Sequence, residues 1–313
     1  MAVTSVDETT VEQILTACHG AYSIRTTQGY RADLRVFSNW CTTRGSPWLP
    51  AAPSDVAAFV DHEIVNHRLS TIKRRLCAIA FAHRMQNLSS PTDANEVRLT
   101  VRRAARLKVA RPHQKRGLTH HVREVLVASC PETLAGRRDA ALISLGYDTL
   151  CRSSELSAMR VEHVTLNADG SGIVLIPRAK SDAIGEGRIA HVSPDTTMLL
   201  RKWIDEAGVT SGPLFRALHL GRVADGPLCT SSVRRLIKRA TIRAGFDPAL
   251  TADLSGHSMP IGAAQDMMVA GFDALAIMQA GGWKSANVVL RYVENAATRS
   301  LHERRWAKLE NVK

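Results

Sequence analysis

Apolar side chains recur every three or four residues through the first third of the chain, and this spacing constrains the fold more than any other feature. Between Thr27 and Thr43 the apolar positions are Tyr30, Leu34, Phe37, Trp40 and Cys41. A period near 3.6 residues places such side chains on one face of a helix. A second helix is predicted from Pro53, because Pro53-Ser54-Asp55 is typical of a helix start. Its apolar face comprises Val56, Phe59, Val60 and Ile64.

A third helix is predicted over STIKRRLCAIAFAHRMQ, with Ser70 as its expected N-cap. Its buried side is expected to hold Ile72, Leu76 and Ile79. The other side carries four basic residues, Lys73, Arg74, Arg75 and Arg84. Two interpretations are open: a solvated helix face, or a face that lies against the phosphate backbone of a nucleic acid.

A basic stretch interrupts this helical pattern. Residues 102–117 read RRAARLKVARPHQKRG, where Pro112 and Gly117 break the regularity. We therefore expect a helical domain over residues 1–110, a basic linker over 111–118 and a second domain over 119–313. The whole chain carries a net charge of +12, which favours a polyanionic partner such as nucleic acid or a membrane surface. A cationic linker between two positive lobes suits a clamp that closes around a duplex.

The second half of the chain has a mixed pattern. Arg137 to Leu150 is predicted to be a helix with Ala141, Leu142 and Leu145 facing inward. Residues 171–180 and 188–193 are predicted to be two strands joined by a turn. From Ser193 onward, helices are expected to the end. The predicted fold class is mainly α: a helical domain followed by a mostly helical domain with a small antiparallel sheet.

Several classes of protein are excluded. No run of residues approaches the ~18 apolar residues of a membrane-spanning helix, and the start MAVTSVDETT does not resemble a secretory signal. The six cysteines are scattered without a C-x-x-C pair, which favours reduced thiols over disulfides or a zinc site. We expect a soluble intracellular protein.

Cofactor motifs are weak or incomplete. Gly185-x-Gly187-x-x-Ala190 leads into a strand, whereas a dinucleotide site needs a helix there. His62-Glu63 is followed by a histidine at His67, one position beyond the spacing of a zinc helix. The sequence has neither a phosphate-binding G-x-x-x-x-G-K-[ST] loop nor a G-x-S-x-G elbow. We therefore expect no cofactor and no metal.

Five residues in the second half form an ordered set suited to phosphate chemistry: Arg152, Lys180, His257, Trp283 and Tyr292. Each is a weak signal alone. Together, the stretch SGHS…GAAQDMMVAG…IMQAGGW…Y resembles the tyrosine recombinase (phage integrase) family, and most closely its Cre-like members. The separations of 26 residues from His257 to Trp283 and 9 from Trp283 to Tyr292 agree with that subgroup. STIKRRLCAIAFAHR and PTDANEVRL extend the resemblance to the first domain, whose family type is a SAM-like core-binding domain.

The resemblance implies a site-specific recombinase that cuts and rejoins duplex DNA without ATP or metal. Tyr292 would attack phosphorus and form a 3′-phosphotyrosyl link, which stores the bond energy. Arg152, His257 and Trp283 would stabilise the charge on the phosphate oxygens. Lys180 would be the general acid for the departing 5′ oxygen. Glu155 would orient this group, although a salt bridge on a helix face is an equal alternative.

One position departs from the family pattern. Three residues after the histidine, the family has a second arginine, and this chain has Pro260. Proline fits the first turn of a helix, with Ser258 as the expected N-cap, but it supplies no charge. Arg178, Arg188 or Arg291 could substitute. The alternative function is a silenced homologue that binds DNA at specific sequences without cutting it.

The resemblance also implies partners. We expect the chain to bind double-stranded DNA and to form a homotetramer on two DNA sites. We expect it to act in the bacterial cytoplasm, at the nucleoid, and to be encoded by a bacterium, a phage or a plasmid. Residues 296–309, with Leu301, Trp306 and Leu309, are expected to form the C-terminal helix exchanged between neighbours, or else to cap their own domain. The DNA-binding candidates, which could contact either bases or phosphates, are Lys73, Arg74, Arg75, Arg234 and Arg235.

Overall fold

The computed structural model describes residues 4–108, 114–177, 187–294, 296, 302–303, 305–307 and 309. The chain separates into two compact units, Met1–Pro112 and His113–Lys313. Within the described ranges, no helix is long and apolar enough to cross a membrane.

The first unit is built from helices. They are α1 (Thr4–Ala17), α2 (Ile24–Arg44), α3 (Pro53–Asn66), α4 (Leu69–Met85), the short 3-10 helix η1 (Pro91–Asp93) and α5 (Asn95–Leu107). Its core contains the side chains that the helical period selects, including Leu34, Phe37, Phe59 and Ile72, all fully buried. The prediction of buried helix faces is confirmed here.

Two details of α4 differ from prediction. The helix begins at Leu69 with Arg68 at its N-cap, so Ser70 lies inside the first turn and does not cap it. Lys73, Arg74 and Arg84 lie on the exposed side, but Arg75 is buried. The prediction that Arg75 shares the exposed face is therefore wrong, because its guanidinium pairs with acidic side chains of α2 and α3.

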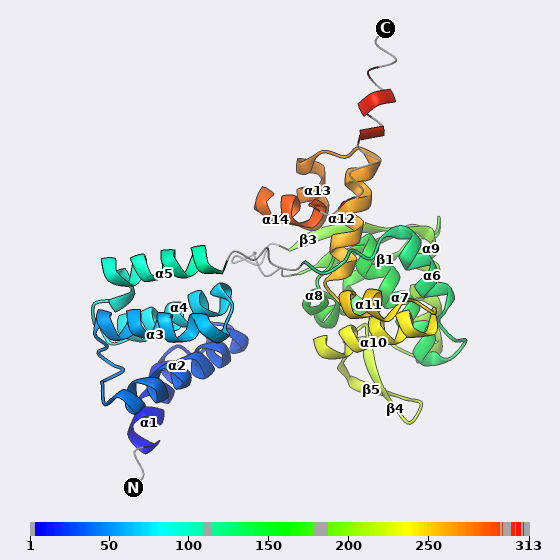
Figure 1. Cartoon of the computed structure of the whole chain (residues 1–313). Coiled ribbons are helices and arrows are strands. Elements are labelled where there is room, and N and C mark those ends of the chain that lie inside the picture. The colour runs from blue at the N-terminus through cyan, green and yellow to red at the C-terminus, as the bar shows by residue number, and fades with distance from the viewer. Residues whose placement is uncertain are drawn as a thin grey trace. The chain divides into compact units, whose positions relative to one another are not determined.

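The second unit combines helices with two small sheets (Figure 1). Its first half holds α6 (His120–Ala128), α7 (Leu134–Asp148), α8 (Ser153–Ala158), η2 (Val161–His163), β1 (Val164–Leu166), β2 (Gly172–Ile176), β3 (Arg188–Val192) and α9 (Pro194–Ala207). Its second half holds β4 (Arg216–His219), β5 (Arg222–Pro227), α10 (Thr230–Arg243), α11 (Pro248–Asp253), α12 (Ser258–Ala270), α13 (Ala274–Gly281) and α14 (Ala286–Val293).

The first sheet has the antiparallel order β1-β2-β3, with Val174 opposite Ala190. The two strands predicted from the sequence are thus confirmed, while the turn between them lies outside the described residues. The prediction of helices alone after Ser193 is wrong, since β4 and β5 form a second antiparallel hairpin. Leu220 and Gly221 connect these strands with positive φ values of 48° and 77°. The first residue of a tight hairpin turn of this kind is normally Asn, Asp or Gly. Because this chain has a leucine there, its sequence does not indicate the turn.

The main core of the second unit lies around α7, with Ala141, Leu142 and Leu145 fully buried as predicted. Gly117 and Leu118 are also buried, and the Leu118 amide donates to the carbonyl of Ser258 at 2.7 Å. These two residues of the predicted linker thus pack into the second unit, while residues 109–113 lie outside the described ranges.

A smaller cluster joins α12, α13 and α14, which lie together in the orange part of the chain (Figure 1). It contains Ile261, Ala264, Ile277 and Val289, together with Trp283 and Tyr292. Two of the predicted site residues therefore belong to a packed apolar cluster, which limits their rotamers and holds them in place.

Candidate active site

Arg152 is held by Glu155 at the start of α8. Arg152 occupies the N-cap position, and its backbone N–H donates to Oε2 of Glu155 at 2.9 Å. Its Nη1 donates to Oε1 of the same carboxylate at 3.0 Å. Glu155 is buried, and the two side chains form a salt bridge at i,i+3 spacing, so the alternative of a salt bridge also holds. One carboxylate therefore orients both the backbone and the guanidinium of Arg152.

The segment before α12 brings His257 towards α8. A Cβ at Gly256 would lie 1.9 Å from Oγ of Ser153, the first residue of α8, so a larger residue here would force that hydroxyl to move. His257 is the N-cap residue of α12 and its side chain is exposed. Ser258 is the first residue of the helix rather than its cap, and its hydroxyl accepts from the amide of Ser255 at 2.9 Å. The expected N-cap was thus one residue late.

Tyr292 lies against His257 and Trp283. Its hydroxyl is hydrogen-bonded to Nε2 of His257 at 2.7 Å, although 35 residues separate the two in sequence. The Trp283 ring packs edge-to-face on the Tyr292 ring, with centroids 4.8 Å apart. Helix α13 ends directly before Trp283, because its C-cap residue Gly282 has φ of 62°. The backbone N–H of Trp283 donates to the carbonyl of Met278.

The indole Nε1 of Trp283 is buried and has no hydrogen-bond partner among the described residues. A buried donor left without an acceptor costs about 1–3 kcal/mol. An oxygen atom of a bound ligand would remove that cost. Trp283, whose ring packs on Tyr292, thus holds a donor that still needs an acceptor.

The electrostatic environment of Tyr292 combines two opposed effects. Burial raises the pKa of its phenol, and the charge and hydrogen bonding of Arg152 act to lower it. The phenol is thus protonated in the free protein at neutral pH.

Pro260 is buried in the first turn of α12, as the sequence predicted for its backbone. It offers neither a charge nor a donor. Lys180 and Arg178 lie outside the described residues. Arg291 is exposed on α14, and its charge acts to lower the pKa of Tyr292.

The basic residues singled out from the sequence divide into two groups. Lys73, Arg74, Arg234 and Arg235 are exposed, on α4 in the first unit and on α10 in the second. Arg75 instead pairs with Glu63, and its Nε lies 3.7 Å from Asp33. Arg74 also contacts Asp33, at 2.8 Å, but keeps 58% of its side chain exposed. Arg75 is thus placed to hold α2, α3 and α4 together.

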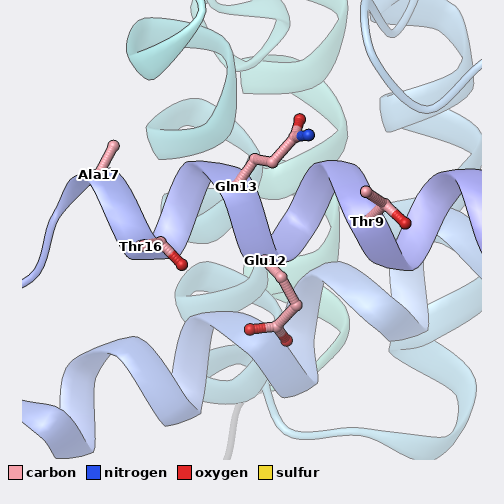
Figure 2. Close-up of a pocket in the computed structure, with 5 residues that line it drawn as sticks. All are labelled: Thr9, Glu12, Gln13, Thr16 and Ala17. Atoms are coloured by element: carbon pink, nitrogen blue, oxygen red, sulfur yellow. The ribbon is translucent and has the colours of Figure 1, made fainter.

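The described residues hold no cluster of three or more His, Cys, Asp and Glu side chains that could bind a metal. A depression of about 560 Å³ lies on α1 of the first unit. Figure 2 shows the residues that line it, Thr9, Glu12, Gln13, Thr16 and Ala17. The carboxylate of Glu12 is paired there with Arg31 at 2.6 Å. None of the predicted site residues lines this depression.

Comparison with known proteins identifies the family. Residues 116–299 match the phage integrase family, and residues 17–84 match its N-terminal SAM-like domain. The chain is 31% identical to the recombinase Cre of Escherichia phage P1 over 295 residues, covering 88% of this chain and 85% of that protein. It is 30% identical to an integrase/recombinase XerD homologue of Selenomonas ruminantium, covering 86% and 81%.

Solved structures share the fold. The XerH site-specific recombinase bound to its palindromic difH substrate gives a TM-score of 0.68 at 18% identity, covering 95% of this chain and 84% of that one. The Tn1549 transposon integrase in complex with transposon right end DNA gives 0.68 at 15% identity, covering 96% and 98%. The matches to both domains and the two relatives agree with the residue pattern. The chain belongs to the tyrosine recombinase (phage integrase) family.

Proposed function

We propose that this chain is a site-specific DNA recombinase that cuts and rejoins duplex DNA through a 3′-phosphotyrosyl intermediate. The observation that carries the proposal is the contact of the Tyr292 hydroxyl with Nε2 of His257 at 2.7 Å, beside the ring of Trp283, whose indole N–H has no partner in the part of the chain that the structure describes. The Tyr292 hydroxyl thus lies against the His257 ring, and Arg152 is close enough for its charge and hydrogen bonding to act on the phenol.

The chemistry assigns a role to each group. The phenol of Tyr292 passes its proton to Nε2 of His257 as its oxygen attacks phosphorus, and the bond from phosphorus to the 5′ oxygen breaks. Arg152, which Glu155 holds, presents a planar fork to two phosphate oxygens. Once protonated, the His257 ring donates to the same oxygens as their charge grows, together with the indole N–H of Trp283. Lys180 gives a proton to the 5′ oxygen, a step typically worth ~10²–10⁴ in rate.

Exposed basic residues in both units support binding to double-stranded DNA. Lys73 and Arg74 lie on α4, and Arg234 and Arg235 lie on α10. The XerH recombinase and the Tn1549 integrase were both solved with DNA. The proposal includes a homotetramer on two DNA sites, linked through residues 296–309, and an enzyme that works in the cytoplasm on bacterial or phage DNA.

A second candidate function rests on Pro260. A buried proline where the family has an arginine removes one charged donor from the site, and one missing donor of this kind typically costs ~10²–10³ in rate. The chain would then bind a specific DNA sequence without cutting it. Both candidates predict the same DNA binding, so cleavage separates them.

Covalent trapping tests the proposal. The chain, Tyr292→Phe and Pro260→Arg are each incubated with a duplex from the DNA that flanks the gene, after specific binding to that duplex has been shown. Tyr22→Phe is the matched control, because Tyr22 is an exposed tyrosine of the first unit. The expected result is an adduct on denaturing gels with the given chain and with Tyr22→Phe, and none with Tyr292→Phe.

Two other results would contradict the proposal. An adduct that survives Tyr292→Phe would exclude Tyr292 as the nucleophile. An adduct formed by Pro260→Arg alone would favour the silenced DNA-binding protein. The salt dependence of binding gives a separate check, since each phosphate contact should contribute about −0.9 to the slope of log K against log salt.

A further inference from the structure

Arg188 connects two segments that lead into the active site. It is the first residue of β3, and its side chain is half-buried. Its Nη1 donates to the carbonyl of Ala280 at 2.9 Å, and its Nη2 donates to the carbonyl of Thr149. Thr149 lies three residues before Arg152, and Ala280 lies three residues before Trp283. One side chain therefore ties together the backbones that present these two groups.

The surroundings of Arg188 leave space for this side chain. A Cβ at Gly282 would lie 2.4 Å from Cδ and 2.9 Å from Nε of Arg188. Gly282 also has φ of 62°, in the left-handed region that favours glycine. A larger residue at this position would displace either Arg188 or the turn that leads to Trp283. The lack of a side chain at Gly282 thus leaves room for the side chain of Arg188.

The charge of Arg188 has no acidic partner among the described residues. Its contacts are two carbonyl oxygens and the thiol of Cys151, whose Sγ lies 3.7 Å from Nη2. Arg152, by contrast, shares its charge with the carboxylate of Glu155. Coulombic attraction is stronger in a partly buried site than in water. Arg188 therefore keeps a positive charge that no described carboxylate pairs, against the side chain of the residue that precedes Arg152.

We propose that Arg188 is a positioning residue for DNA cleavage, which holds the Arg152 and Trp283 segments together and supplies positive charge where Pro260 supplies none. This inference rests on the proposed recombinase function. Arg188 acts through the backbones that it holds and through its field, without contacting the reacting phosphate.

The test compares Arg188→Gln and Arg188→Lys with the given chain, on the same flanking duplex used for covalent trapping. Arg201→Gln is the matched control, because Arg201 is exposed and donates to the carbonyl of Asn167 at 2.9 Å on the surface of the second unit. The measurements are the rate of adduct formation at saturating protein, the Kd for the duplex and the melting temperature.

The expected result is a split between chemistry and binding. Arg188→Gln should slow adduct formation by about 100-fold, since a misplacement near 1 Å costs about that much, with the Kd unchanged. Arg188→Lys should recover part of the rate, because an ammonium keeps the charge and reaches one carbonyl. Arg201→Gln should cleave at the parental rate. If Arg188→Gln fails to fold, Arg188→Lys alone still shows whether the cleavage rate falls while the Kd for the duplex stays unchanged.

A cycle with Pro260→Arg tests the charge. If Arg188 makes up for the missing guanidinium, Arg188→Gln should slow cleavage less in the Pro260→Arg background than in the given chain. Equal losses in the two backgrounds, or a parental rate for Arg188→Gln, would overturn the inference alone. The inference would also be overturned if the chain without substitutions formed no adduct and Pro260→Arg did. No adduct from any variant that binds DNA would overturn the proposed function, and this inference with it.

Discussion

Gly262 is a position at which α12 packs tightly against the backbone of Leu118. A Cβ there would lie 1.9 Å from the carbonyl oxygen of Leu118, 2.1 Å from its carbonyl carbon and 2.6 Å from its amide nitrogen. Ordinary contact begins at 3.4 Å, so Gly262→Ala requires a shift of about 1.5 Å. All three atoms belong to backbone, which has no rotamer to change.

The expected magnitude follows from two opposed effects. An alanine in place of a helical glycine normally stabilises a helix by about 1 kcal/mol. Overpacking a core typically costs 1–3 kcal/mol and occasionally more, and the rigid backbone on both sides favours the upper end. We expect Gly262→Ala to destabilise the second unit by about 2 kcal/mol. At about 2–4 °C per kcal/mol for a domain of this size, its melting temperature should fall by about 4–8 °C.

Differential scanning calorimetry measures this change, with Gly29→Ala as the matched control. Gly29 lies inside α2, and a Cβ there would have no atom within 4 Å. Gly29→Ala should therefore raise the stability of the first unit by up to about 1 kcal/mol. An unchanged or raised melting temperature for Gly262→Ala would refute the reasoning, because helix propensity would then outweigh the contact with Leu118.

Three further predictions concern single side chains. Arg74→Gln should weaken DNA binding and reduce its salt slope by about 1. Arg75→Gln should instead lower the free energy of unfolding by about 3–5 kcal/mol, because Glu63 loses a buried partner. Mobility shifts and urea melts on both variants check this, and equal losses of DNA binding would contradict the assignment. Glu155→Gln should slow adduct formation by about 10- to 100-fold, since a hydrogen bond to a charged group is worth about 1.5–3 kcal/mol; a parental rate would show that Arg152 needs no such support. Hydrogen bonds from Ser231 and Ser232 lower the pKa of the exposed Cys229 to about 6, so its alkylation by iodoacetamide should rise from pH 5 and level off above about pH 7; peptide mapping of the alkylated protein measures it, and a rise centred near pH 8.5 would contradict the lowered pKa.

Much of the helical fold could be predicted from the sequence, because the signal is local. Leu34, Phe37 and Cys41 are buried where a period of 3.6 residues places them. The hairpin of β4 and β5 was missed because Leu220 occupies a left-handed turn position that leucine rarely adopts. Arg75 was misplaced because its burial depends on Glu63 and Asp33, which come from other helices.

The candidate site divides in the same way. The order and spacing of Arg152, His257, Trp283 and Tyr292 in the sequence were enough to indicate the family and to single out these residues as candidates, since spacing is a property of the chain alone. Only the tertiary structure determined that Tyr292 bonds His257 across 35 residues, and that Arg188 joins the segments before Arg152 and Trp283. Periodicity and capping depend on neighbours within about one helical turn. Contacts between distant segments depend on how every intervening element packs, and no local pattern in the sequence encodes that packing.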